Sequence, residues 1–510
     1  MRYGFVIDQR RCIGCHACTV ACKQENQVPL GVFRTWVKYV EKGVFPETRR
    51  YFSVLRCNHC DDAPCVTICP TVALYRRDDG IVDFDGDRCI GCKSCMQACP
   101  YDALYIDPAT QTAAKCNYCA HRVEVGLEPA CVIVCPTTAI IAGDLDDPAS
   151  KIARLVAREP VQVRKPEQGT RPKVFYLGAD AAALTPQLQA PAERYLWAQR
   201  PERELDLVKL VVAAQAGDGG ADRALSRPVY DAPHEPRPWG WKVAAYLWTK
   251  SVAAGALLVG ALGVLSGGEA TGFLLGRAAP LLALLFLLAT TALLVFDLKR
   301  PARFLYILVK PNFRSWLVWG AWILIAYGGV AALWLAAALA GSAGLVRVAA
   351  LPAFALAAAT AGYSAFLFGQ AEGRDFWQSP LVLPQLLVAA TIAGAAALLI
   401  IGFLGRVDVL SLWSLSVIMV LALALQALLL AAELFVPHAN LDAARAARLI
   451  TRGPWKTAFW GGAVAAGTAL PIVLVWPNPY SAVLGAVLAL AGLWIYEDLW
   501  VKAGQAAPLS

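Results

Sequence analysis

All 16 cysteines of this 510-residue chain lie between positions 12 and 135, in four runs of four. The runs are Cys12, Cys15, Cys18 and Cys22; Cys57, Cys60, Cys65 and Cys69; Cys89, Cys92, Cys95 and Cys99; and Cys116, Cys119, Cys131 and Cys135. The first and third have the spacing C-x2-C-x2-C-x3-C, which is typical of iron–sulfur ligands. The second and fourth lengthen the gap before the third cysteine but keep the final x3 gap and the Cys-Pro end.

The spacing predicts [4Fe–4S] clusters, because three close thiolates bind three corners of one cube while the fourth reaches a neighbouring cluster. Zinc sites favour paired C-x2-C knuckles instead. Disulfides are disfavoured, because residues 1–22 contain no apolar export segment. The motif Cys12-x-x-Cys15-His16 matches c-type haem attachment, but haem would take two ligands from a cluster. His59 and His121 are expected beside the cluster ligands or at the surface. The spacing of the cysteines leaves open which runs share a cluster.

The formal net charge of +8 does not indicate nucleic-acid binding. Four oxidised clusters with their thiolates would add about −8, since each carries about −2. The corrected charge is near zero, so we expect no nucleic-acid partner.

The rest of the chain is apolar and free of cysteine. Segments of about 20 apolar residues are candidates for membrane spans. We count eight, at 241–266, 279–298, 315–340, 348–370, 381–404, 409–436, 457–476 and 480–500. We therefore predict a head domain at 1–188, a linker at 189–238 with a short helix near 193–215, and an all-α membrane domain of eight transmembrane helices at 239–510.

Eight spans place both termini on one side of the membrane. The loops and tail on that side carry eleven basic residues, namely Lys299, Arg300, Arg303, Lys310, Arg314, Arg374, Arg445, Arg448, Arg452, Lys456 and Lys502. The opposite loops carry three, namely Arg277, Arg347 and Arg406. Because loops rich in Lys and Arg lie on the cytoplasmic side of a membrane, we expect the cysteine-rich head on the cytoplasmic side of a prokaryotic inner membrane.

Polar residues within or at the ends of the spans are candidates for a quinone and proton site, because ionisable groups in lipid are costly and usually functional. They are Lys250, Asp297, Arg300, Arg303, Tyr363, Glu372, Glu433 and His438. All but Lys250 fall on the head side. Alternatives stay open: Lys250 could snorkel to the interface, Arg300 and Arg303 could contact lipid or the head, and Glu433 with His438 could be an ordinary helix-end pair. Since only His438 lies near a span, no b-type haem is expected.

The cysteine runs, with RPKVFYLGAD at 171–180, resemble the four-cluster electron-transfer subunits of the molybdoenzyme family that includes polysulfide, dimethyl sulfoxide and nitrite reductases. The resemblance implies an α+β ferredoxin-like double dicluster head with nested pairing of the runs. The implied sets are Cys12, Cys15, Cys18 and Cys135; Cys22, Cys116, Cys119 and Cys131; Cys57, Cys60, Cys65 and Cys99; and Cys69, Cys89, Cys92 and Cys95. Lys23 stands where the other runs have Pro, which does not affect ligation.

The stretch FDLKRPARFLYILVKPNFRSWLVWGAW at 296–322 resembles the NrfD/PsrC family of haem-free quinone-reactive anchors, and similarity continues at 372–380 and 433–462. This implies a fused electron-transfer and quinone-reactive subunit that uses menaquinone or ubiquinone. The sequence has no Walker A or Rossmann glycine motif, so the terminal-substrate site is expected on a separate, molybdopterin-type catalytic subunit. The alternative is a redox-driven proton- or ion-translocating module without quinone chemistry of its own.

Overall fold

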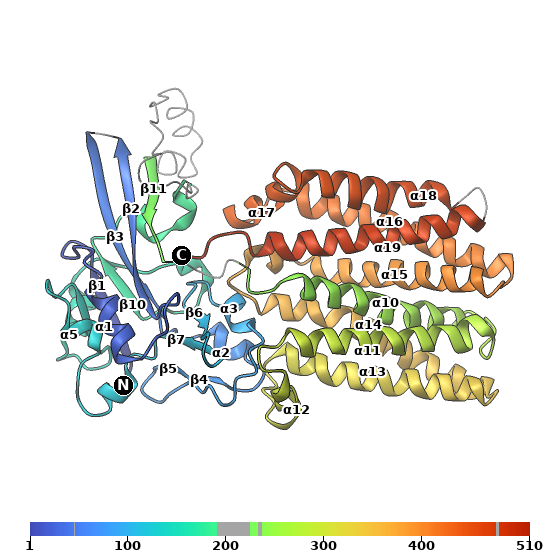
Figure 1. Cartoon of the computed structure of the whole chain (residues 1–510), viewed down its shortest axis with the longest axis horizontal. Helices are drawn as coiled ribbons and strands as arrows, with labels where there is room; N and C mark the ends of the chain where they lie inside the picture. The colour runs from blue at the N-terminus through green and yellow to red at the C-terminus, as the bar shows by residue number, and fades with distance from the viewer. Residues whose placement is uncertain (45, 191–224, 233–236, 476–478) are drawn as a thin grey trace. The chain divides into compact units, whose positions relative to one another are not determined.

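The computed structural model describes the chain except residue 45 and residues 191–224, 233–236 and 476–478, and Figure 1 shows its elements. The chain divides into two compact units: Met1–Pro236 with Pro508–Ser510, and Arg237–Ala507. The last residues belong to the first unit because buried side chains hold them: Lys38 donates to the Ser510 carbonyl at 2.9 Å and Arg164 to the Leu509 carbonyl at 2.9 Å. The helix expected near 193–215 lies outside the described residues.

The head contains a four-stranded sheet in the order β8-β1-β10-β9. Its strands are β1 (Tyr3–Asp8), β8 (Ile140–Asp144), β9 (Val161–Gln162) and β10 (Val174–Leu177). Strand β1 pairs parallel with β10 and antiparallel with β8. On one face Val6 packs with Ile152 of α6 (Lys151–Arg158), and on the other Phe5 and Ile7 pack toward the cysteines. The sheet is therefore the support against which the cysteine-bearing segments fold.

A second sheet has the order β11-β2-β3, formed by β2 (Thr35–Val44), β3 (Glu47–Arg56) and β11 (Ser226–Tyr230). Strand β11 falls inside the predicted linker at 189–238, yet it pairs antiparallel with β2. The sequence pattern did not predict this strand, because β11 pairs with the open edge of β2 and backbone pairing needs no apolar pattern in the added strand. The head unit therefore continues past residue 188.

The cysteines lie on short helices and in the loops on either side of them. The helices are α1 (Ala17–Glu25), α2 (Pro64–Ile68), α3 (Ser94–Ala98), α4 (Ala120–Val123) and α5 (Ala130–Ile133), with hairpins β4 (Leu74–Arg76) to β5 (Val82–Phe84) and β6 (Leu104–Ile106) to β7 (Ala113–Lys115) between them. Each CIGC loop needs a positive φ two residues after its first cysteine, at Gly14 and Gly91. Glycine adopts that conformation without a side-chain clash. Smaller head elements are η1 (Pro166–Gln168), α7 (Ala181–Leu184) and η2 (Pro186–Leu188).

The second unit is a bundle of long apolar helices (Figure 1). Seven helices of the described chain are long and apolar enough to cross a membrane: α10 (Trp241–Leu265), η4 with α11 (Phe273–Asp297), α13 (Trp316–Leu339), α14 (Ala343–Gly369), α15 (Val382–Leu404), α16 (Val409–Phe435) and α19 (Pro479–Gly504). The remaining predicted span, 457–476, is a shorter segment of η7 (Ala458–Ala469) and α18 (Leu470–Leu474). Connecting elements are η5 (Pro301–Arg303), α12 (Tyr306–Val309), η6 (Asp375–Gln378) and α17 (Leu441–Thr451).

The structure confirms a head with strands and an apolar helical region. Seven helices of the described residues are long enough to cross a membrane, and the eighth predicted span corresponds to the shorter apolar helix Ala458–Leu474, so the predicted count of eight is approximate. The second span begins earlier than predicted, because a π-helical turn at Phe273–Ala278 extends α11 backwards. Helices α10 and α15 form the interior of the bundle. In their apolar 18-residue stretches 83% and 72% of the residues are buried, compared with 33–50% in the other spans. Glycine permits the two inner helices to touch, because small residues let helix backbones approach closely.

Replacing Gly394 with alanine is expected to destabilise the bundle. A Cβ atom at Gly394 would lie under 3.0 Å from the backbone of Gly255, so the two helices would have to separate. Overpacking of this kind costs about 1–3 kcal/mol. Thermal unfolding in detergent measures the effect, with Gly329→Ala as control because a Cβ there meets nothing within 4 Å. Equal unfolding temperatures for both variants would contradict this packing.

Candidate iron–sulfur sites and buried polar clusters

The structure gathers cysteines from different runs around two cavities in the head. One cavity is lined by Cys69, Cys89, Cys92 and Cys95. The other is lined by Cys22, Cys116, Cys119 and Cys131. In each case three thiols come from one run and the fourth from another. These are two of the four sets that the family resemblance implies.

The remaining eight thiols lie close to the partners expected for them. Burial raises the pKa of Cys65, and the neighbouring thiols of Cys99, Cys57 and Cys60 raise it further. Burial likewise raises the pKa of Cys12, with added contributions from Cys135 and Cys15. The pKa of Cys18 is raised to about 11, first by burial, although Arg56 lowers it, and then by Cys131 and Cys12. Cys18 therefore lies between two sets.

All 16 thiols are free of disulfide bonds. Among the described residues, no group of three or more His, Cys, Asp or Glu side chains is close enough to share a single metal ion. A tetrahedral zinc ion needs four ligands at about 2.0–2.3 Å, whereas each thiolate of a [4Fe–4S] cube binds a different iron. Four thiols line each cavity, which is the number of ligands that one [4Fe–4S] cube requires.

Donors around the thiols also fit a sulfur-rich group. Backbone N–H groups of Gly91 and Ala113 donate to the Cys89 Sγ at 3.4 and 3.3 Å, and that of Ala139 donates to the Cys135 Sγ at 3.2 Å. His59 is buried, with 1% of its surface exposed, and its Nδ1 accepts from the Val82 N–H at 3.2 Å. Burial and then the Lys115 and Lys173 charges lower the pKa of His59, so the imidazole is neutral.

The proton of His59 is therefore on Nε2, which is buried without a hydrogen-bond partner among the described residues. An orphaned buried donor costs free energy unless an acceptor is supplied, and cluster sulfur would supply one. His121, by contrast, lies at the surface with its Nε2 2.8 Å from Glu25.

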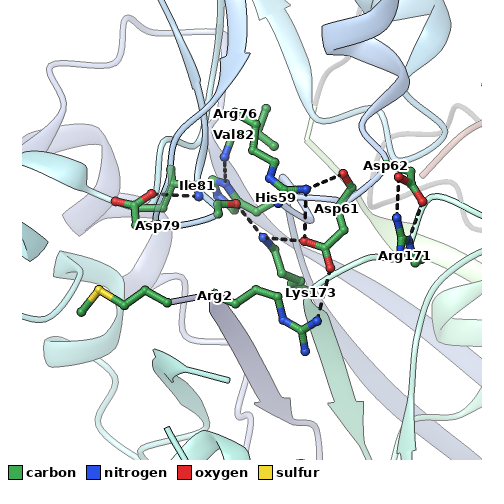
Figure 2. A network of polar contacts seen from close by, with 12 residues as sticks. Arg2, His59, Asp61, Asp62, Arg76, Asp79, Ile81, Val82, Arg171 and Lys173 are labelled. Atoms are coloured by element: carbon green, nitrogen blue, oxygen red, sulfur yellow. Dashed lines mark hydrogen bonds and ion pairs between the residues drawn. The ribbon is translucent and has the colours of Figure 1, made fainter. Parts of the chain in front are cut away.

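Ion pairs fix the loop that carries Cys57 and Cys60 (Figure 2). The carboxylate of Asp61 lies 3.2 Å from the Lys173 Nζ, 3.6 Å from an Arg2 nitrogen and 3.7 Å from an Arg76 nitrogen. Its neighbour Asp62 accepts two hydrogen bonds from Arg171, at 2.5 and 2.6 Å. Arg171 and Lys173 belong to the RPKVFYLGAD segment, so that segment holds the second cysteine run in place.

In the bundle, Lys250 is at the centre of a buried polar cluster. Only 1% of its surface is exposed, so it does not snorkel to the interface. Its Nζ donates to the Ala361 carbonyl at 3.0 Å and to the Ser364 Oγ at 2.7 Å, and it lies 4.9 Å from the centre of the Tyr363 ring. Two of the predicted residues, Lys250 and Tyr363, are thus in contact.

Glu497 of α19 completes this cluster and was missed in the sequence. It is 5% exposed and close enough to interact electrostatically with Lys250. Its Oε1 accepts from the Ser251 Oγ at 3.4 Å, while Oε2 is buried without a hydrogen-bond partner among the described residues. The sequence feature that could have identified Glu497 is an acidic residue inside the last predicted span. Asp498 and Lys502 follow it within five residues, so the segment resembles the polar end of a helix.

Glu433 lies in a separate polar cluster formed by α15, α16 and α19. Its carboxylate accepts from the Tyr496 hydroxyl at 2.7 Å, the Gln385 amide at 2.7 Å and the Trp500 indole at 3.3 Å. These three donors were also missed, because they lie on helices distant in sequence. His438 is half-buried just after α16, and its Nε2 is buried without a hydrogen-bond partner among the described residues.

The other predicted residues lie at helix ends. Asp297 is the last residue of α11, Arg300 directly precedes the short η5 turn, and Arg303 is the last residue of that turn. Glu372 lies between α14 and η6, and all four are half-buried. Asp297 interacts electrostatically with the buried Tyr246, which is also within range of Tyr363 and Glu497. Tyr246 therefore connects the end of α11 to the Lys250 cluster.

Comparison with known families and proteins places each half of the chain. The family model described as "Polysulphide reductase, NrfD" matches residues 231–507, a "4Fe-4S dicluster domain" matches 48–145, and a "4Fe-4S binding domain" matches 10–26. The B subunit of tetrathionate reductase of Salmonella typhimurium is 51% identical over 200 residues, which is 38% of this chain and 80% of that protein. Protein NrfC of Escherichia coli is 46% identical over 178 residues, 34% of this chain and 80% of that protein.

A third relative is the arsenate respiratory reductase iron-sulfur subunit ArrB of a Shewanella species, 37% identical over 226 residues, 35% of this chain and 96% of that protein. All three cover only about a third of the chain, whereas the NrfD match lies in the other part. The chain is thus a fusion of a ferredoxin-type module and an NrfD-like membrane module.

Proposed function

This chain is a member of the polysulphide reductase NrfD family, and on that basis we propose that it is the electron-transfer and quinone-reactive membrane subunit of a respiratory oxidoreductase. Its head carries electrons between a quinone in the bilayer and a separate catalytic subunit, of molybdopterin type by family resemblance. The proposal is supported by the names of two relatives of the head, which are subunits of reductases. The head is proposed to face the cytoplasm of a prokaryotic cell.

The observation that carries the proposal is the pair of cavities in which three thiols of one run meet one thiol of another. We propose four [4Fe–4S] clusters held by the nested sets given above, without haem. Such clusters supply one-electron transfer when bound. The chain's own residues supply the ligands, the N–H donors to sulfur and the ion pairs that fix the second run.

The quinone is proposed to bind in the bundle. Its reduction takes two electrons and two protons, so the site needs donors at the carbonyl oxygens and groups that pass protons. Lys250, Tyr363, Glu433 and His438 are proposed for these roles, with Asp297, Arg300, Arg303 and Glu372 at the helix ends as the route to water. Either menaquinone or ubiquinone satisfies this chemistry.

The proposal is tested with anaerobically purified chain in lipid nanodiscs. We expect dithionite-reduced protein to be reoxidised when a water-soluble menaquinone or ubiquinone analogue is added. The recovery of the visible absorption of the clusters monitors this reoxidation. A tight-binding quinone-site inhibitor should block the recovery. Fully loaded protein, verified by iron and sulfide analysis, that is not reoxidised by either quinone would contradict the proposal.

The buried Lys250–Glu497 pair favours a second candidate, in which the bundle moves protons or ions without quinone chemistry of its own. Two ionisable groups within the bundle are suited to hold and release a proton. Reconstituted vesicles with a pH-sensitive dye distinguish the candidates. Proton movement that follows cluster oxidation in quinone-free lipid would favour the second candidate, and movement that requires quinone favours the first.

A further inference from the structure

Arg56, the last residue of β3, points into the cavity lined by Cys22, Cys116, Cys119 and Cys131. Its side chain is 1% exposed. The Nη1 donates to the Cys131 Sγ at 3.1 Å, and the guanidinium lies 4.5 Å from the centre of the buried Phe5 ring. It is also within electrostatic range of Cys116 and Cys18.

The guanidinium has capacity for more hydrogen bonds than the protein supplies. Both Nε and Nη2 are buried without a hydrogen-bond partner among the described residues. A buried cation is tolerated only when an anion or acceptors compensate it. The negative charge nearest to Arg56 is that of the thiolates, and of any cluster that they bind.

We propose that Arg56 raises the reduction potential of the cluster held by Cys22, Cys116, Cys119 and Cys131. Reduction adds one electron to a group that is already negative, and cluster potentials depend on net charge and on hydrogen bonds to sulfur. A fixed cation 3.1 Å from a ligand sulfur stabilises the more negative, reduced form over the oxidised form. The electron comes from a neighbouring cluster or an added reductant, and no proton is transferred.

The effect is assigned to the one cluster whose ligand sulfur Arg56 contacts directly. This inference rests on the clusters of the proposed function and not on the quinone site.

The test is an EPR-monitored redox titration of the whole chain in detergent. The relevant signal is identified as the one lost in Cys131→Ser. In Arg56→Gln we expect the equilibrium constant for its reduction to fall at least tenfold, a shift of about 59 mV to lower potential. Arg56→Lys should restore most of the potential because it keeps the charge. Arg34→Gln is the matched control, because Arg34 lines the same cavity but is half-buried and donates to Asn26 and Asn117.

A second measurement needs no variant. With 15N-labelled arginine in the native chain, the reduced cluster should show a hyperfine coupling to guanidinium nitrogen, and Arg34→Gln should retain it. Unchanged potential in an iron-replete Arg56→Gln, or no coupling in the labelled native chain, would overturn the role of Arg56. Purified chain without iron and sulfide would instead contradict the proposed clusters.

Discussion

Cys69→Ser is expected to remove one complete cluster, because Cys69 supplies the fourth thiol of the cavity formed with Cys89, Cys92 and Cys95. A hydroxyl is a harder and poorer ligand for iron–sulfur groups than a thiolate. We expect the loss of roughly four iron atoms per chain. Electron transfer from reduced head to quinone should fall at least about 100-fold, since even changes outside the ligand shell cost 10–100-fold. Iron analysis and the rate of quinone-dependent reoxidation measure both effects.

The nested pairing provides the control. Cys89→Ser should remove the same EPR signal as Cys69→Ser, although the two residues belong to different runs. Cys99→Ser and Cys57→Ser, each as a single variant, should both remove a second EPR signal, because those thiols lie near Cys65 in another set. If Cys69→Ser and Cys57→Ser abolish the same signal, each run binds its own cluster and the nested pairing is incorrect.

Lys250→Met and Glu497→Gln are each expected to slow quinone-coupled turnover, measured as the rate at which added quinone reoxidises the reduced head, by roughly 100-fold. This factor lies within the range for general acid–base groups. Each change also leaves the other group buried without its counter-charge, which costs about 3–5 kcal/mol for a broken buried pair. Because both are 5% exposed or less, water cannot compensate the remaining charge. Turnover and thermal unfolding in nanodiscs give the two quantities.

The double variant separates stability from chemistry. Lys250→Met with Glu497→Gln removes both charges, so most of the lost stability should return while turnover stays low. Lys242→Met is the matched control, because it removes a lysine from the end of the same helix, where Lys242 donates to the Phe296 carbonyl. Native turnover in the double variant would show that the pair has only a structural role.

Features encoded by local spacing could be predicted from the sequence. The cysteine runs and the length of the apolar segments depend only on neighbouring residues, so the iron–sulfur head and the helical membrane part were both expected and are both confirmed by the families that match. The predicted span at 457–476 corresponds to the apolar helix Ala458–Leu474, and its ends differ by one or two residues because composition does not fix where a helix begins and ends.

Contacts between distant residues could not be predicted in this way. Arg56 precedes Cys57 in the chain, yet its side chain donates to Cys131, 75 residues away. Glu497 resembles a helix-end acid until α10 is packed beside it, and the three donors to Glu433 come from two other helices. The extension of the head sheet by β11 likewise depends on an edge that exists only once β2 and β3 have paired.

The sequence by itself determined which ligands this protein offers and which segments enter lipid, because thiol spacing and apolar length act over a few residues or turns. Only the tertiary structure decided which thiols share a cavity, which charges face one another in the bundle and which cation lies beside a ligand sulfur. Those arrangements are set by packing and burial between segments far apart in the chain, and burial is what gives a single lysine, glutamate or arginine its electrostatic strength.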